Sequence, residues 1–190
     1  MLGVIMTRLK LFCVCLASSI SVLGALAGDP TSQPEAGKAV VAGWFQVRNQ
    51  KYSDLLRPEE ANGADGTRIV LYPAQPWKCM TWRFHANGES RFQLQNYFTS
   101  KTFAAEAGAD KAQAAVTQVP FSKKSDERPT WQFTKLTDGT YKITDAKSGK
   151  ALTAVKDKAE STARMVLQTW QEGDAQKWKL IEIDPKQLTM

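Results

Sequence analysis

The stretch YKITDAKSGKALTAV (141–155) and its continuation ARMVLQTWQEGDAQKW (163–178) decide the fold of this chain. The stretch opens with Tyr141 and Ile143, which alternate with polar residues as in a half-buried strand. A polar turn, two further apolar segments and a closing Trp178 complete it. Short apolar segments separated by turn residues predict strands rather than helices.

The same pattern occurs three times along the chain. Each copy has four markers in the same order: an opening aromatic residue, an apolar residue beyond a turn, an apolar run and a closing tryptophan. The opening aromatic residues are Phe45, Phe92 and Tyr141, which are 47 and 49 positions apart. The closing tryptophans are Trp82, Trp131 and Trp178. Ordered markers at a fixed period indicate a repeat architecture.

The junctions between the copies predict hairpins. Asn87-Gly88 precedes the second copy and Asp138-Gly139 precedes the third, and such pairs favour two-residue hairpin turns. The last strand of one copy should therefore pair with the first strand of the next. Three repeats of four strands predict an all-β, closed architecture with pseudo-threefold symmetry, because closure removes exposed strand edges. We expect the three closing tryptophans to form its structural core.

The N-terminus has the layout of an export signal. Arg8 and Lys10 precede an uncharged apolar run, which ends in a small-residue cleavage pattern at 25–27. We therefore expect a secreted or periplasmic protein. The predicted organisation is a signal peptide at 1–27, a flexible lead-in at 28–42, the β domain at 43–184 and a C-terminal tail at 185–190.

Composition excludes several kinds of site. The formal net charge is +6, but basic and acidic residues are interspersed, so we expect no nucleic-acid partner. Beyond the signal the chain has one cysteine, Cys79, and one histidine, His85, which is too few ligands for a zinc site of the His/Cys type. We expect Cys79 to be buried and His85 to be a solvated hairpin residue. We also expect no metal, no cofactor, no catalysis and a monomer.

Residues 43–184 resemble the ricin-type (ricin B-like) β-trefoil lectin domain, in which each repeat ends in a Gln-x-Trp motif. The third repeat carries the motif in full, as Gln176-Lys177-Trp178. Further similarity lies in SGKAL (148–152) and in VLQTWQEG (166–173). The resemblance implies a β-trefoil fold and shallow sugar-binding pockets, up to one per repeat.

A sugar presents apolar C–H faces and fixed hydroxyls, so its site needs a flat apolar surface and a few strong hydrogen bonds. The resemblance implies an acid after the conserved leucine, an aromatic residue in the third strand and an amide near the Gln-x-Trp motif. No repeat has all of them, and in the third repeat Thr153 stands at the acid position and Gln168 at the aromatic position. The carbohydrate-binding residues predicted there are Thr153, Gln168, Trp170, Asp174 and Gln176.

We therefore expect an exported, non-catalytic carbohydrate-binding module whose partner is a glycan or a glycosylated surface. Trp170 is either a partly exposed stacking platform or a core residue that packs inward. The alternative function is a trefoil scaffold for protein interaction or inhibition, without sugar binding, which would use long loops at 57–67 and 105–128.

Overall fold

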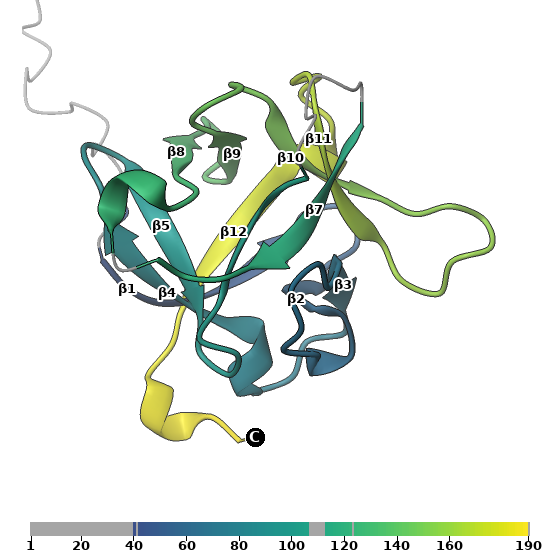
Figure 1. Cartoon of the computed structure of the whole chain (residues 1–190). Coiled ribbons are helices and arrows are strands. Elements are labelled where there is room, and N and C mark those ends of the chain that lie inside the picture. Colours follow the sequence, from purple (N-terminus) through teal and green to yellow (C-terminus); the bar gives the residue numbers. More distant parts are fainter. Residues whose placement is uncertain (1–39, 41, 107–112, 123, 190) are drawn as a thin grey trace, which may run out of the picture. The chain divides into compact units, whose positions relative to one another are not determined.

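The computed structural model describes residues 40, 42–106, 113–122 and 124–189. The predicted signal peptide and nearly all of the lead-in lie outside these residues. The described part contains twelve β-strands and several single-turn 3-10 helices (Figure 1). Within it, no helix combines the length and the apolar character that crossing a bilayer requires.

The strands fall into three consecutive groups of four, as the repeats predict. The first group is β1 (Gly43–Asn49), β2 (Leu55–Pro58), β3 (Ile69–Tyr72) and β4 (Thr81–Ala86). The second is β5 (Arg91–Asn96), β6 (Thr102–Ala105), β7 (Ala114–Val119) and β8 (Trp131–Lys135). The third is β9 (Tyr141–Asp145), β10 (Ala151–Val155), β11 (Arg164–Gln168) and β12 (Lys177–Glu182).

The first and last strands of the three repeats form a closed antiparallel barrel. In order around the barrel, β1 pairs with β4, β4 with β5, β5 with β8, β8 with β9, β9 with β12, and β12 again with β1. The last strand of each repeat thus pairs with the first strand of the next. This closed ring confirms the predicted architecture and leaves none of its six strands with an unpaired edge.

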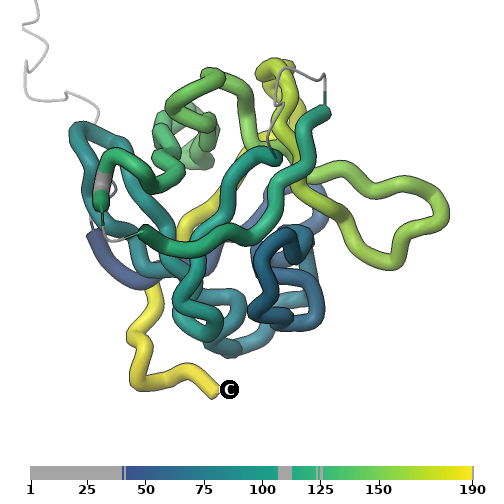
Figure 2. The backbone as a smooth tube through the Cα atoms, in the orientation of Figure 1, coloured from purple at the N-terminus to yellow at the C-terminus, as the bar shows by residue number. Residues whose placement is uncertain are grey.

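The two middle strands of each repeat form a hairpin, and the three hairpins associate at one end of the barrel. β11 pairs with β7 through Val166 and Leu167 and with β3 through Arg164. The loop between β10 and β11 projects from the side of the domain, as the yellow-green tube in Figure 2 shows. At the base of that loop, a guanidinium nitrogen of Arg164 lies 2.9 Å from a carboxylate oxygen of Asp157.

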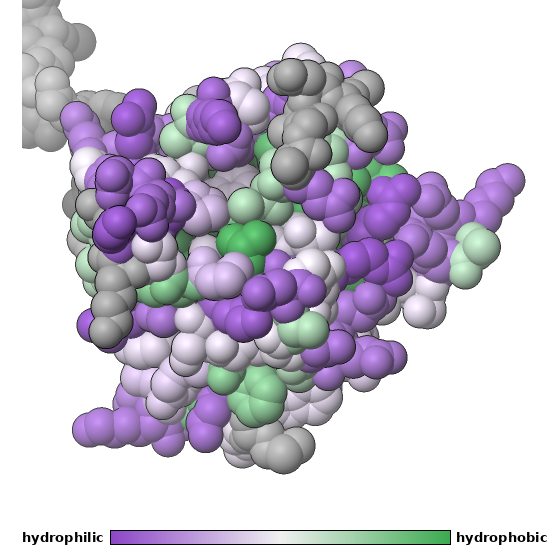
Figure 3. All heavy atoms as spheres, viewed as in Figure 1, coloured by the Kyte–Doolittle hydropathy of each residue, from purple (hydrophilic) through white to green (hydrophobic). Residues whose placement is uncertain are grey.

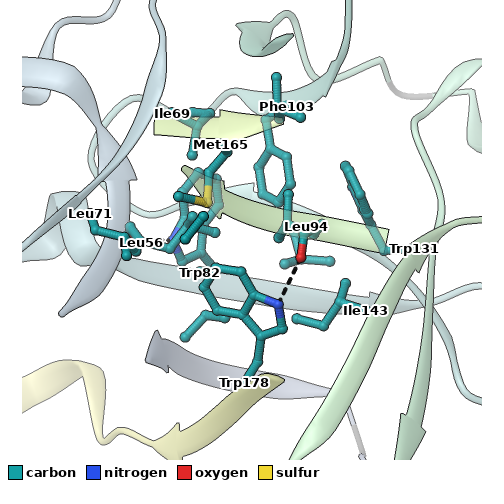
Figure 4. Close-up of a cluster of buried hydrophobic side chains, with 14 of the residues drawn as sticks. Leu56, Ile69, Leu71, Trp82, Leu94, Phe103, Trp131, Ile143, Met165 and Trp178 are labelled. Atoms are coloured by element: carbon teal, nitrogen blue, oxygen red, sulfur yellow. Dashed lines mark hydrogen bonds between the residues drawn. The ribbon is translucent and has the colours of Figure 1, made fainter. Parts of the chain in front are cut away.

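One hydrophobic cluster fills the barrel and the space under the hairpins (Figure 4). Trp82, Trp131 and Trp178 are each fully buried in it, which confirms their predicted place in the core. Since each large ring buries about 150–250 Å² of apolar surface, these residues are major contributors to stability. The face of the molecule in Figure 3 is mainly hydrophilic, with isolated apolar areas.

The connections differ from the sequence-based expectations in three places. The hairpin loops at 87–90 and 136–140 are longer than two residues, although Gly88 and Gly139 adopt the positive φ values that such turns require. The expected loop at 105–128 contains strand β7, because small and β-branched residues there pair with β6. The tail contains a 3-10 turn at Pro185–Gln187, and Thr189 pairs with Trp77.

Candidate functional site

The five predicted residues of the third repeat lie on neighbouring elements. Thr153 is on β10, Gln168 ends β11, and Trp170 follows β11. Asp174 and Gln176 form the ends of a 3-10 turn that leads into β12. The Ala151–Gln168 pair of the β10–β11 ladder connects the two strands close to this loop. The fold therefore gathers these residues at one edge of the third repeat.

Gln176 is an internal clamp on the loop that carries Trp170. Its Oε1 accepts a hydrogen bond from the backbone N–H of Gln171 at 2.7 Å, and its Nε2 donates to the carbonyl of Thr169 at 2.9 Å. These two residues flank Trp170 on either side. Gln176 is only 3% exposed, so its amide holds the loop from beneath.

Thr153 completes this clamp. Its hydroxyl accepts a hydrogen bond from Gln176 Nε2 at 3.0 Å and donates to the carbonyl of Ala151 at 3.0 Å. Thr153 is 4% exposed. The polar groups of Thr153 and Gln176 thus form hydrogen bonds inside the protein. Both residues lie below the surface, where they hold the loop that carries Trp170 in position.

Trp170 is half-buried and lies outside the buried core, so it is partly exposed, as the first of the two interpretations has it, and its role in stacking on a sugar stays a prediction. The Nζ of Lys142, on β9, lies 5.5 Å from the centroid of its ring, within the range of a cation–π interaction. Lys142 reaches this place because β9 pairs with β12, where it lies opposite Lys177. No local sequence signal connects Lys142 with Trp170, and only the register of the barrel does.

Acidic groups lie at the surface of the same loop. Glu172 and Asp174 are both exposed, and Glu172 has a positive φ of 59°. Lys177 donates to Asp138 at 3.0 Å. That hydrogen bond raises the pKa of Lys177 most; burial opposes the shift, and the charges of Asp138, Glu172 and Asp174 add to it. A half-buried ring beside carboxylates and a half-buried Gln168 can present both a stacking surface and hydrogen-bond acceptors.

The corresponding positions of the other repeats hold different chemistry. In the first repeat, the side chain of Arg57 packs against the ring of Tyr72, with 3.8 Å between the guanidinium carbon and the ring centroid. In the second repeat, Ala104 and Arg128 line a hollow of about 860 Å³ that also borders the turn between β9 and β10. Among the described residues, no group of three or more His, Cys, Asp or Glu side chains could hold a metal ion.

Comparison with known proteins gives a family match and structural matches. Residues 128–189 match the family model described as ricin-type beta-trefoil lectin domain-like. No curated protein sequence matches the chain.

Several solved structures share the fold. The designed threefold-symmetric protein ThreeFoil is 24% identical, with a TM-score of 0.67 over 74% of this chain and 99% of that chain. The agglutinin of Rhizoctonia solani is 18% identical, with a TM-score of 0.67 over 78% of this chain and all of that one (100%). The lectin of Polyporus squamosus is 14% identical, with a TM-score of 0.61 over 76% of this chain and 50% of that chain. This protein is accordingly a β-trefoil whose residues 128–189 match the ricin-type lectin family, which confirms the resemblance read from its sequence.

Proposed function

We propose that this protein is a non-catalytic glycan-binding module that engages its ligand at the edge of the third repeat. The observation that carries the proposal is the placement of Trp170. Its ring is half-buried, and the loop that bears it is fixed by Gln176 on both sides. A fixed aromatic ring loses little conformational freedom when a sugar stacks on it, which favours binding.

The polar surroundings fit the same ligand class. Gln168, Glu172 and Asp174 offer an amide and two carboxylates near the ring, and sugar hydroxyls donate well to such acceptors. Lys142 and Lys177 lie on the adjoining strands and can donate to ring or hydroxyl oxygens. In this arrangement Thr153 and Gln176 position the loop, and the surface residues meet the sugar.

The comparisons support the ligand class. The matched family is described as lectin domain-like, and lectins are among the proteins with the same fold. The solved Polyporus squamosus lectin was bound to a sialylated trisaccharide, and an earthworm R-type lectin to GalNAc. We propose a glycan or a glycosylated surface as the partner of this chain as well.

A glycan array followed by titration tests this proposal. Wild-type protein should bind at least one glycan, and Trp170→Ala should weaken that binding roughly tenfold or more through the loss of stacking. Trp77→Ala is the matched control, because Trp77 is also a half-buried tryptophan but lies in the first repeat. Absence of binding at millimolar sugar, or equal binding by Trp170→Ala and wild type, would contradict the proposal.

We also propose that the protein is exported. The charged start, the apolar run and the small-residue pattern at 25–27 support cleavage after residue 27. Mass spectrometry of the protein recovered from outside the cytoplasm should then give a chain that begins at Gly28. A chain that retains residues 1–27 would contradict cleavage there.

A further inference from the structure

A second hollow is lined by residues of the first two repeats and by none of the five residues predicted at the third-repeat edge. It has a volume of about 460 Å³, and the described residues that line it come from the start of β1, from β4 and β5, and from the connection between β7 and β8. Its chemistry rests on four side chains: Trp44, Arg83, His85 and Arg128.

Strand register builds one wall of the hollow. Trp44 on β1 is paired with Arg83 on β4, and the guanidinium carbon of Arg83 lies 5.6 Å from the Trp44 ring centroid. Arg83 is exposed and His85 half-buried, while Phe84 between them points into the core. Behind Trp44, the Tyr97 ring lies 4.5 Å away and supports it. The wall therefore combines the Trp44 ring with a guanidinium that lies over it.

The opposite wall comes from a feature of the second repeat alone. Its connection between the third and fourth strands, at 120–130, is three residues longer than those at 73–80 and 169–176. Phe121 in this connection lies 5.1 Å from the His85 ring. Arg128 in turn lies 4.6 Å from the Phe121 ring and lines the hollow. This connection thus brings a second guanidinium to the hollow that Arg83 also lines.

The charged side chains that line the hollow are arginines. The described residues that line it include Arg83 and Arg128 but no carboxylate. The two cations also act on His85: burial lowers the pKa of His85 most, Arg83 and Arg128 lower it further, and the hydrogen bond with Gln95 opposes them. His85 was expected to be a solvated hairpin residue, and the longer connection explains why it is partly covered instead.

We propose that this hollow is a binding site for the acidic group of a saccharide, a carboxylate or a sulfate. Two guanidinium groups suit such a group because arginine forms paired, charge-assisted hydrogen bonds with planar carboxylates and with sulfate-like oxyanions. The half-buried rings of Trp44 and His85 line the hollow and can contact the pyranose through their exposed parts. This site differs from the third-repeat edge in its elements, and its charged lining residues are arginines, whereas the edge carries both carboxylates and lysines.

The saccharide part of this assignment rests on the proposed function, whereas the requirement for an anion rests on the hollow itself. Experiments can separate the proposed glycan site from the proposed anion site, because different residues form each of them. Trp170→Ala should remove binding at the third-repeat edge and leave anion-dependent binding intact. Arg83→Gln should have the opposite effect.

Isothermal titration with glucuronate, glucose 6-sulfate, glucose and inorganic sulfate tests the assignment. The two acidic sugars should bind wild type at least about tenfold more tightly than glucose, and Arg83→Gln should abolish that difference. Arg91→Gln is the matched control, since Arg91 is an exposed arginine on β5 that bonds to Gln132 and does not line this hollow. Binding of the acidic sugars should also weaken as salt concentration rises.

Three results would overturn the assignment. One is equal binding of glucuronate and glucose by wild type. Another is an unchanged preference for acidic sugars in Arg83→Gln, whose folding is checked by its thermal midpoint. The third is binding of inorganic sulfate as tight as that of glucose 6-sulfate, which would show that the sugar ring contributes nothing.

Discussion

The guanidinium carbon of Arg57 lies 3.8 Å from the centroid of the Tyr72 ring. In the first repeat these residues stand where the family resemblance implies an acid and a sugar-stacking aromatic ring. Arg57 is only 9% exposed, so the cation itself covers the ring. The first repeat thus uses these two positions for an internal contact.

We predict that Arg57→Ala lowers the free energy of unfolding by about 1–2 kcal/mol, through loss of the cation–π contact and of packing by its aliphatic stem. Tyr72→Phe keeps the ring and should change stability much less. Urea denaturation measures both effects. Glycan binding should be unaffected in either variant, and a loss of binding as large as that of Trp170→Ala would contradict this account of the first repeat.

Gln176→Ala should destabilise the protein by about 1–3 kcal/mol, because it removes the hydrogen bonds that hold the backbone of Thr169 and Gln171. It should also weaken glycan binding by freeing the loop of Trp170. Thr153→Val should cost about 1 kcal/mol and weaken binding much less than Gln176→Ala, since Thr153 lies below the surface and acts on the loop only through Gln176. Chemical denaturation and glycan titration of the single and double variants check this. Lost binding in a fully stable Thr153→Val variant would instead place its hydroxyl against the sugar.

The three core tryptophans differ in one hydrogen bond. Trp82 Nε1 donates to the Leu56 carbonyl at 3.0 Å and Trp178 Nε1 to the Leu152 carbonyl at 3.1 Å. The buried Nε1 of Trp131 has no hydrogen-bond partner among the described residues.

Substitution of each tryptophan by phenylalanine should reveal this difference. All three variants lose ring volume, but only Trp82→Phe and Trp178→Phe lose a buried hydrogen bond. We predict that Trp131→Phe is less destabilising than the other two by about 1–2 kcal/mol. Guanidinium denaturation of the three proteins side by side measures the order. Equal losses would show that the hydrogen bonds of Trp82 and Trp178 contribute nothing net.

Asp138 should make the folding stability of the protein depend on pH in the acidic range. Hydrogen bonds from the Thr140 hydroxyl and backbone N–H, and then from Lys177, lower the pKa of Asp138 from 3.8 to about 2. Because the folded pKa is below the ordinary value, the stabilisation is fully present above about pH 4 and is lost as the pH falls towards 2. Thermal midpoints of wild type and Asp138→Asn should therefore differ at pH 5 and converge near pH 2. A constant difference across this range would exclude the carboxylate as its source.

The sequence predicted the fold well because its signals are local or periodic. Alternation around Phe45, Phe92 and Tyr141 marks strands, and the period of the repeats implies a closed threefold arrangement. Loop lengths were predicted less well. The turn glycines were correct, but the number of residues around Gly88 and Gly139 depends on how the barrel strands meet.

The candidate site was predictable only in outline. Gln168, Trp170 and Asp174 have the surface or half-buried places that a binding role requires, and their role in sugar binding stays a prediction. The burial of Thr153 and Gln176 could not be read from spacing, since it depends on hydrogen bonds across the β10–β11 hairpin and the following loop.

By itself, then, the sequence determined the three-repeat β-trefoil, the tryptophan core and the third repeat as the place where family similarity is strongest. Only the tertiary structure decided which polar groups are surface groups and which are internal. Lys142 meets Trp170, and Arg128 shares a hollow with Arg83, because antiparallel register and one longer connection bring distant segments together. Contacts of this kind depend on the closure of the barrel, and a linear pattern of residues carries no record of them.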